Sequence, residues 1–332
     1  MNITSLVQLI DGDLKNHPSI SFVYNIQTNI AKLRDGDLFL SNDELQIDQA
    51  AKLGAFGIVY ENSLIKISDK EIAWIQVAKL EDAIIKLIRY FLSNIELNVF
   101  LIDEITLEIL KLTSTQNYIL FDENLNENLI KAQSLQKDDI IICCNKILLK
   151  KIYPLFKTFP IKNYELTNVT IHSIFETTFS HNGTLYSRVK VPYLYIDTFL
   201  SIIEYLDIKL PLQEIIGLRK WNLLNPIFIN KAYKPIDFGR SDRFIMTTQS
   251  VKKALYQLSH IQDNYTYGKI IILIDQKLSQ NSKNTISYTD NEELEFFIKT
   301  LNYNLLYIIG KDNDEVIKIL QKPTSQVSLF DF

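Results

Sequence analysis

Apolar residues follow two alternating spacings along the chain, one typical of buried strands and one typical of helices. Short apolar runs such as Val99 to Ile102 and Leu305 to Ile309 have the length and β-branched composition of buried strands. Elsewhere apolar residues recur every three or four positions, as in Leu80 to Phe91, which is the spacing of an amphipathic helix. Because the two patterns alternate through most of the chain, they predict an α/β protein with parallel sheets and crossover helices.

The first region, residues 1–96, alternates strands and helices. A turn at Asp35-Gly36 leads into a strand that ends at Leu40, and Gly54 is placed to end a helix in the left-handed conformation that glycine tolerates. The other predicted strands are Ser21 to Tyr24, Gly57 to Glu61 and Ala73 to Val77, and the predicted helices are Ile47 to Leu53 and Leu80 to Phe91.

The middle region, residues 97–215, begins with a regular strand–helix alternation. Strands are predicted at Val99 to Ile102, Tyr118 to Phe121 and Asp139 to Cys144, and helices at Ile105 to Leu112, Leu125 to Leu135 and Ile147 to Phe156. A β-rich part follows, in which Val169 to Phe179 and Thr184 to Val191 form a hairpin around the turn His181-Asn182-Gly183, before a helix from Tyr195 to Leu206.

The third region, residues 216–322, has the pattern of a small doubly wound, Rossmann-like sheet. Its predicted strands are Arg243 to Thr247, Lys269 to Asp275 and Leu305 to Ile309, and its predicted helices are Ser250 to Ser259, Glu292 to Leu301 and Asp312 to Leu320. Residues 323–332 form a C-terminal tail, because Pro323, Thr324 and Ser325 have the composition of a linker.

Three segments of the first region carry a resemblance to a known family. They are RDGDLFL (Arg34 to Leu40), AAKLGAFGIVYE (Ala50 to Glu61) and AWIQVAKLEDAIIKLIRYF (Ala73 to Phe91). Their order and spacing resemble the N-terminal domain of the Mur ligases, which build the peptide of peptidoglycan, and look most like the D-Ala-D-Ala-adding branch, MurF. In outline the resemblance covers nearly the whole chain. It implies three α/β domains, with a middle ATPase domain that is truncated here and a Rossmann-like C-terminal domain.

The residues that carry the family's chemistry are replaced in this chain. Where the resemblance implies an Asp-Ser-Arg that holds uridine, the chain has Asn29, Ile30 and Ala31. Where it implies an acidic pair after the first strand of the third region, the chain has Thr247 and Thr248, and the Asn-Pro loop that should follow is missing. The resemblance therefore predicts the scaffold of a ligase without its substrate contacts.

The junction after the strand Val99 to Ile102 is where the resemblance implies a phosphate-binding loop. Such a loop uses glycines whose backbone N–H groups surround the phosphate, together with a Lys and a Ser or Thr. The chain has no glycine between Gly57 and Gly183, and Asp103 and Glu104 would repel a triphosphate. These carboxylates either hold a metal ion or form the acidic helix start that the helix dipole favours, and we expect the second. We predict no catalytic, cofactor-binding or metal-binding residues and no cofactor.

Composition limits the classes of protein and the cellular compartments that fit this chain. A net charge of -4, with 22% charged and 47% hydrophobic residues, is typical of a globular protein and argues against direct nucleic-acid binding. The adjacent Cys143 and Cys144 cannot build a disulfide framework, so we expect small core residues in a reducing cytoplasm. We expect no secretory signal and no membrane span, because no basic leader precedes an apolar core and no run reaches ~18 apolar residues. The histidines stand singly, without metal-ligand spacing: His17, His172, His181 and His260.

Two further segments are candidate interaction sites. The first is a basic cluster that either holds an anion or a partner's acidic face or is a solvated loop, made by Lys231, Lys234, Arg240 and Arg243. The second is the tail QVSLFDF, which resembles the short peptide by which bacterial replication proteins dock on the sliding clamp. In that resemblance Gln326 enters a polar notch and Leu329 and Phe330 fill a pocket. The alternative is a tail folded back on its own core or on a sheet edge.

The function that these patterns favour is a diverged, non-catalytic Mur ligase relative that acts as a binding or scaffolding protein linked to peptidoglycan synthesis. Its partner is then a protein, such as an enzyme of cell-wall synthesis. The enzymatic alternative is an ATP-dependent ligase that joins an acid to an amino acid through an unconventional nucleotide site. The third alternative is a protein that binds the sliding clamp through its tail.

Overall fold

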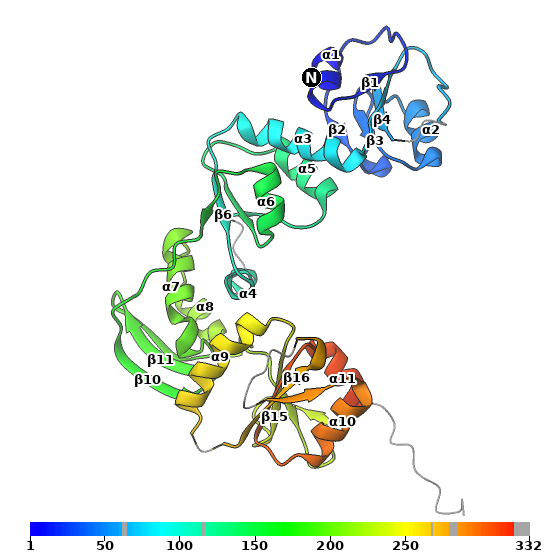
Figure 1. Cartoon of the computed structure of the whole chain (residues 1–332). Coiled ribbons are helices and arrows are strands. Elements are labelled where there is room, and N and C mark those ends of the chain that lie inside the picture. Colours follow the sequence, from blue (N-terminus) through cyan, green and yellow to red (C-terminus); the bar gives the residue numbers. More distant parts are fainter. Residues whose placement is uncertain (62–64, 114–116, 267, 279–284, 322–332) are drawn as a thin grey trace, which may run out of the picture. The chain divides into compact units, whose positions relative to one another are not determined.

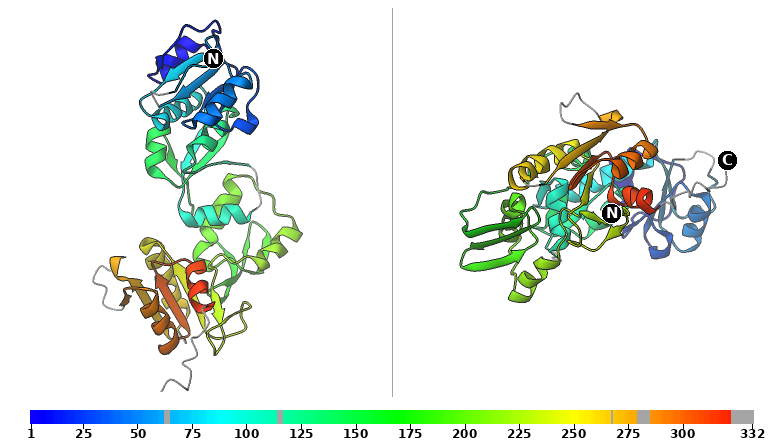
Figure 2. Two further views of the ribbon diagram at one scale, coloured as in Figure 1. Left: turned by 90° about the vertical axis from the view of Figure 1, so that its right-hand side faces the viewer. Right: turned by 90° about the horizontal axis from the view of Figure 1, so that it is seen from below.

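The computed structural model describes residues 1–61, 65–113, 117–266, 268–278 and 285–321. The chain divides into two compact units, residues 1–160 (unit 1) and residues 161–332 (unit 2). Strands and helices alternate in both units, as Figures 1 and 2 show, so the predicted α/β class is confirmed. The division into domains 1–96, 97–215 and 216–322 with a tail at 323–332 stays a prediction.

The first sheet of unit 1 has the strand order β1-β5-β4-β3-β2. Strands β2 to β5 are parallel, and β1 joins β5 antiparallel, so that β2 forms one edge. Its elements are α1 (Ile3–Leu9), β1 (Asp13–Leu14), β2 (Ile26–Gln27), η1 (Ile30–Lys32), β3 (Leu38–Leu40), α2 (Glu44–Lys52), β4 (Gly57–Tyr60) and β5 (Ala73–Gln76).

The predicted strand at Ser21 to Tyr24 is wrong. Phe22 makes only an isolated bridge to Asn2, and the edge strand β2 begins five residues later than predicted, at Ile26. The ring of Tyr24 packs over a turn: it lies where a Cβ on Gly36 would be, at a φ of +89° that favours glycine.

The second sheet of unit 1 is fully parallel, with the order β7-β8-β6-β9. Helix α3 connects the two sheets, and its Leu87 and Ile88 belong to one hydrophobic cluster that also contains Ile75 of the first sheet and Ile141 of the second. The elements are α3 (Leu80–Ser93), β6 (Asn98–Leu101), α4 (Glu104–Leu112), β7 (Ile119–Phe121), α5 (Leu125–Gln133), β8 (Ile140–Cys143), α6 (Lys146–Ile152) and β9 (Lys157–Thr158).

Unit 2 begins with an antiparallel sheet of order β10-β11-β12. The predicted hairpin at His181-Asn182-Gly183 is confirmed, since Asn182 and Gly183 both have positive φ. The predicted single strand Val169 to Phe179 is wrong, because it folds back at a two-residue turn where Ile174 is buried. The elements are β10 (Thr167–Ser173), β11 (Glu176–His181), β12 (Thr184–Val189), η2 (Tyr193–Tyr195), α7 (Ile196–Tyr205), α8 (Leu212–Gly217) and η3 (Leu218–Lys220).

The larger sheet of unit 2 has the order β14-β13-β15-β18-β16-β17. Its last four strands in this order, β15, β18, β16 and β17, are parallel to one another. Helices α10 and α11 share a core with Leu306 and Ile308, whereas α9 bonds through Gln257 to the hydroxyl of Tyr307, whose side chain points to the other face. The sheet is therefore doubly wound, as predicted. The elements are β13 (Ile227–Ile229), β14 (Pro235–Ile236), β15 (Phe244–Thr248), α9 (Val251–Asn264), β16 (Ile270–Asp275), η4 (Gln276–Leu278), β17 (Ile286–Tyr288), α10 (Asn291–Thr300), β18 (Leu305–Ile309) and α11 (Asn313–Gln321).

Candidate functional site

Strand β6 occupies the position in the parallel sheet where a ligand site is expected. It lies between β8 and β9, and the chain visits β7 and β8 on one side before it crosses to β9 on the other. In open parallel sheets, ligands bind outside the carboxyl ends of the strands where successive connections leave in opposite directions. The junction between β6 and α4 is therefore the first place to look for bound phosphate.

The start of α4 is closed by its own side chains. Asp103 has extended backbone angles and caps the helix: its Oδ1 accepts the N–H of Thr106 at 2.8 Å and the hydroxyl of the same residue at 2.7 Å. Ile105 and Ile109 are buried, which fixes the helix against the sheet. A carboxylate of the chain thus occupies the place at this helix start that a phosphate would take. The prediction of an acidic helix start for Asp103 and Glu104 is consistent with this geometry.

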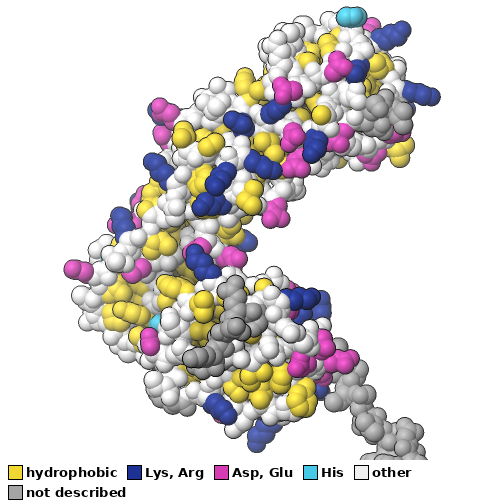
Figure 3. All heavy atoms as spheres, viewed as in Figure 1, with side chains coloured by type: hydrophobic (Ala, Val, Ile, Leu, Met, Phe, Trp, Pro, Cys, Tyr) yellow, Lys and Arg dark blue, Asp and Glu magenta, His cyan; other side chains and the backbone are white. Residues whose placement is uncertain are grey.

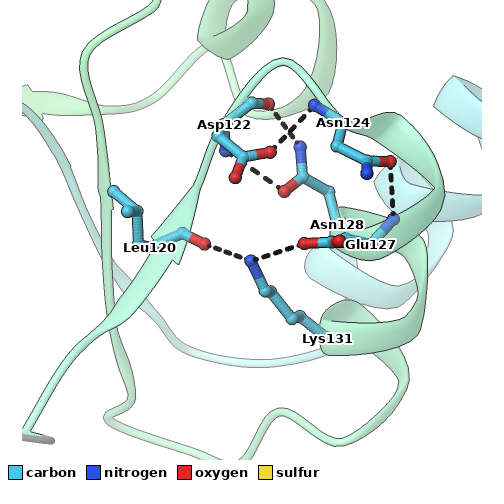
Figure 4. A network of polar contacts seen from close by, with 6 residues as sticks. All are labelled: Leu120, Asp122, Asn124, Glu127, Asn128 and Lys131. Atoms are coloured by element: carbon cyan, nitrogen blue, oxygen red, sulfur yellow. Dashed lines mark hydrogen bonds and ion pairs between the residues drawn. The ribbon is translucent and has the colours of Figure 1, made fainter.

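The turn after β7 is held by a network of polar contacts drawn in Figure 4. The buried amide of Asn128 donates to the Asp122 carbonyl at 2.7 Å and accepts the Asp122 N–H at 3.2 Å. The Asp122 carboxylate accepts the N–H of Asn124 at 2.8 Å, and Lys131 donates to the Leu120 carbonyl at 2.8 Å. These contacts join the end of β7 to the first turns of α5, so the network stabilises the strand end.

The two cysteines lie at the carboxyl end of β8 as free thiols. Cys143 is buried, as predicted, but Cys144 is exposed, so the prediction of a second core residue is wrong. Although the residue as a whole is exposed, loss of water around its sulfur and the neighbouring Cys143 and Asp103 raise the pKa of Cys144 to about 11. The thiol therefore stays protonated near neutral pH, which makes it a poor nucleophile.

A groove that no sequence pattern predicted lies at the β2 edge of unit 1. Two adjoining cavities of about 550 Å³ each share Gln27 and Lys32 in their walls. Helix α5 forms the opposite wall, and the side-chain amide of Gln133 holds it to β2 by accepting the Ile26 N–H at 2.8 Å and donating to the Ile26 carbonyl at 3.0 Å. No local sequence pattern predicts this contact, because Ile26 and Gln133 are 107 residues apart.

The walls of the groove are mostly polar. Lys32 and Arg34 lie in one cavity, and they form no ion pair within the part of the chain that the structure describes. The positions where the family resemblance implies uridine contacts also line the groove: Asn29 and Ile30 lie in one cavity and Ala31 in the other. On the face of unit 1 drawn in Figure 3, Lys and Arg side chains lie among Asp and Glu side chains, so this face is not broadly basic.

The predicted basic cluster is only partly a surface feature. Lys231, Lys234 and Arg240 are exposed near β14. Arg243 instead lies between two aromatic rings, with its guanidinium 5.1 Å from the centroid of Tyr233 and 4.7 Å from that of Tyr303. The Arg243 side chain thus has a structural role, and anion or partner binding by the other three stays a prediction.

Three further sequence predictions concern metal binding, membrane spans and the C-terminal tail. Among the described residues, no group of three His, Cys, Asp or Glu side chains is arranged to hold a metal ion. Within the same part of the chain, no helix is long and apolar enough to cross a membrane. The tail residues Gln326, Leu329 and Phe330 lie outside the described residues.

Comparisons with known proteins agree with the architecture. No family model and no curated protein matches the sequence. Crystal structure I of MurF from Acinetobacter baumannii is similar with a TM-score of 0.51 and 10% identity, over 97% of this chain and 99% of that chain. MurF from Thermotoga maritima in complex with ADP matches at 14% identity with a TM-score of 0.49, over 90% of this chain and 96% of that chain. The resemblance predicted from the three N-terminal segments is thus confirmed for the architecture: the chain has a Mur-ligase-like fold.

Proposed function

We propose that this chain is a non-catalytic binding protein built on a Mur-ligase-like fold and linked to peptidoglycan synthesis. The observation that carries the proposal is the β6–α4 junction, where Asp103 caps the helix at the site expected for phosphate. An incoming triphosphate would displace this carboxylate or lie against it. Both arrangements oppose binding, because like charges repel and the helix start would lose its cap.

Neighbouring strand ends support the same conclusion. Besides Asp103, the carboxyl edge of this sheet carries Glu104, Asp122 and Glu123. The first turn of α4 itself holds the acidic Glu104, and the basic residue of the helix, Lys111, lies in its last turn. Phosphoryl transfer depends on cations and N–H groups that neutralise charge on the phosphates, so the local charge has the wrong sign for that reaction.

Replacements in unit 2 also support the proposal. At the end of β15, where the family resemblance implies an acidic pair, Thr248 is buried. The hydroxyl of Thr247 donates to the Asn313 amide oxygen at 2.6 Å, and the Asn313 amide in turn donates to the Asn225 carbonyl at 2.7 Å. These contacts tie the strand end to α11, and the two positions where the resemblance implies carboxylates carry threonine hydroxyls instead.

Titration calorimetry with ATP and magnesium tests the proposal against the ligase alternative. The full chain is titrated beside the Thermotoga maritima MurF, whose structure holds ADP, as the positive control. We expect a binding signal from the control and none from this chain. Micromolar binding to this chain, abolished by magnesium removal, would contradict the non-catalytic proposal and favour a ligase with an unconventional site.

A protein partner is part of the proposal, and the tail offers a second candidate. The sequence QVSLF supports docking on the sliding clamp. The clamp is therefore the second candidate partner, beside the enzymes of cell-wall synthesis. Free thiols at Cys143 and Cys144 suit a reducing cytoplasm, where either partner would be met. A pull-down with purified clamp compares the full chain with a variant that ends at Ser325. Equal recovery of both would refute tail docking.

A further inference from the structure

The chain passes from unit 1 to unit 2 at Pro160 and Ile161. Up to this point unit 1 holds it: strand β9 pairs with β6, and the buried Phe159 donates its N–H to the Leu101 carbonyl at 3.0 Å. Pro160 and Ile161 are exposed, and within the described part of the chain neither makes a hydrogen bond. The backbone of these two residues is therefore free to turn.

Directly after this crossing, the chain is bound to helix α7. The N–H of Lys162 donates to the Ser201 hydroxyl oxygen at 2.9 Å. The N–H of Tyr164 donates to the Asp197 carboxylate at 3.1 Å. Glu204 accepts from the Lys162 ammonium at 2.8 Å and from the Tyr164 hydroxyl at 2.7 Å. The three α7 residues follow one another at i, i+4 and i+7, so they form one stripe that binds the segment to the helix.

A buried bridge connects α7 to the larger sheet of unit 2. The hydroxyl oxygen of Tyr195, the residue just before α7, accepts a hydrogen bond from the side-chain amide of Gln257 on α9 at 2.8 Å. The carbonyl oxygen of the same amide accepts from the hydroxyl of Tyr307 on β18. These three side chains are at most 3% exposed. Separating α7 from the sheet would leave buried polar groups without partners, which is unfavourable.

The smaller sheet of unit 2, β10 to β12, is tied to the larger sheet by the tip of its first hairpin. The two-residue turn between β10 and β11 is Ile174-Phe175, whereas such turns usually carry Asn or Gly. Ile174 is buried, and the ring centroid of Phe175 lies 6.2 Å from that of Phe228 on β13 and 5.4 Å from that of Phe244 on β15. The apolar turn is stable because it packs on the larger sheet instead of facing water.

The domain boundary that the sequence predicts at residue 215 lies in a packed part of unit 2. Ile215 and Leu218 are buried, and the Leu218 carbonyl accepts the N–H of Lys190 at 3.1 Å. The guanidinium of Arg219 donates to the Ser187 carbonyl at 2.9 Å. Both bonds join this part of the chain to β12 or to the residue just after it. The predicted boundary is therefore not a free linker.

We propose that unit 2 moves as one body and that turning between the two units is confined to the backbone of Pro160 and Ile161. The ring of Pro160 fixes its φ at about −65°, so the freedom lies in ψ of Pro160 and in φ and ψ of Ile161. This pivot goes beyond the proposed function, because it concerns movement and not a ligand. It means that two residues control the orientation of the body with the β2 groove relative to the body from which the C-terminal tail extends.

Residual dipolar couplings of the full, deuterated chain test the pivot, because each rigid body gives one alignment tensor. The couplings are fitted separately for the sheet that contains β6, for the smaller sheet of unit 2 and for the larger sheet of unit 2. We expect the two sheets of unit 2 to share one tensor and the β6 sheet to have another. One tensor for all three sheets, three different tensors, or a smaller sheet that aligns with the β6 sheet would each overturn the proposal.

A first variant tests the pivot residue. Pro160→Gly releases φ and should reduce the degree of order of one unit relative to the other, while the two sheets of unit 2 still share one tensor. If the alignment of both units is the same as in the parent chain, Pro160 does not limit the turning and the assigned pivot is wrong.

A second variant tests the segment bound to α7. Glu204→Ala removes two hydrogen bonds and should lower the heteronuclear NOE of residues 162–164 toward that of Ile161. Glu214→Ala, at an exposed carboxylate on α8, is the matched control and should leave these values unchanged. NOE values in Glu204→Ala that equal those of the control would show that α7 does not hold the segment, and the pivot could then not be confined to two residues.

Discussion

Removing the Asp103 carboxylate is the most direct test of how the β6–α4 junction is built. In Asp103→Ala the helix start loses two hydrogen bonds, from the N–H and from the hydroxyl of Thr106. An N-cap contributes about 0.5–2 kcal/mol, and the favourable charge at the helix dipole about 0.3–1 kcal/mol. We therefore expect the free energy of unfolding of unit 1 to fall by about 1–2 kcal/mol.

A second substitution separates the cap from the charge. Asp103→Asn keeps an oxygen that can accept both bonds and removes only the negative charge, so it should cost less than about 1 kcal/mol. The assay is urea unfolding followed by circular dichroism, with hydrogen exchange of the Thr106 amide as the local measurement. Asp48→Ala, an exposed carboxylate inside α2, is the control and should have little effect.

Two results would refute this reasoning. If Asp103→Ala is as stable as the parent chain, the carboxylate does not cap α4. If Asp103→Asn is destabilised as much as Asp103→Ala, charge and not hydrogen bonding dominates. Faster exchange of the Thr106 amide in the alanine variant alone, by about tenfold for each 1.4 kcal/mol, would support the cap.

Three other predictions concern unit 2 and the cysteines. Arg243→Met should lower the free energy of unfolding by about 1–2 kcal/mol through loss of two ring contacts, and Arg240→Met, at an exposed site, should change it little in the same urea assay. Burial lowers the pKa of His260 from 6.5, so its neutral form is favoured in the folded chain; stability should fall as pH drops below 6.5, and His260→Gln should flatten the pH dependence of the melting temperature between pH 7 and 5. With a pKa of about 11, Cys144 should react with iodoacetamide slowly at pH 7.5 and much faster at pH 10, measured by mass spectrometry; rapid reaction at the lower pH would contradict the raised pKa.

Sequence signals that depend only on neighbouring residues predicted the positions of helices and strands well. The strand predicted at Leu305 to Ile309 is observed at the same residues, and the helix predicted from Leu80 to Phe91 runs to Ser93. Runs of apolar residues and helical spacing depend on neighbours within about four residues, which is why they can be read from the chain. The short strands β13, β14 and β17 were not predicted, because each has only two or three residues.

The candidate sites were predicted less completely. The acidic helix start at Asp103 follows from its position between a strand and a helix, and the structure adds the cap to Thr106. The groove was not predicted, because it depends on where α5 lies against an edge strand. The place of Arg243 was also missed, since its two aromatic neighbours lie 10 residues before it and 60 residues after it in the numbering, at Tyr233 and Tyr303.

Three features can be read from the chain without its structure: the α/β class, the family-like succession of segments and the absence of glycine between Gly57 and Gly183. Tertiary structure alone decided that Gln133 closes the β2 edge at Ile26 and that a polar groove forms beside it. The physical reason is the range of each interaction. Hydrophobic periodicity and helix caps act over a few residues, whereas a groove is made by side chains that only the packing of distant elements brings together.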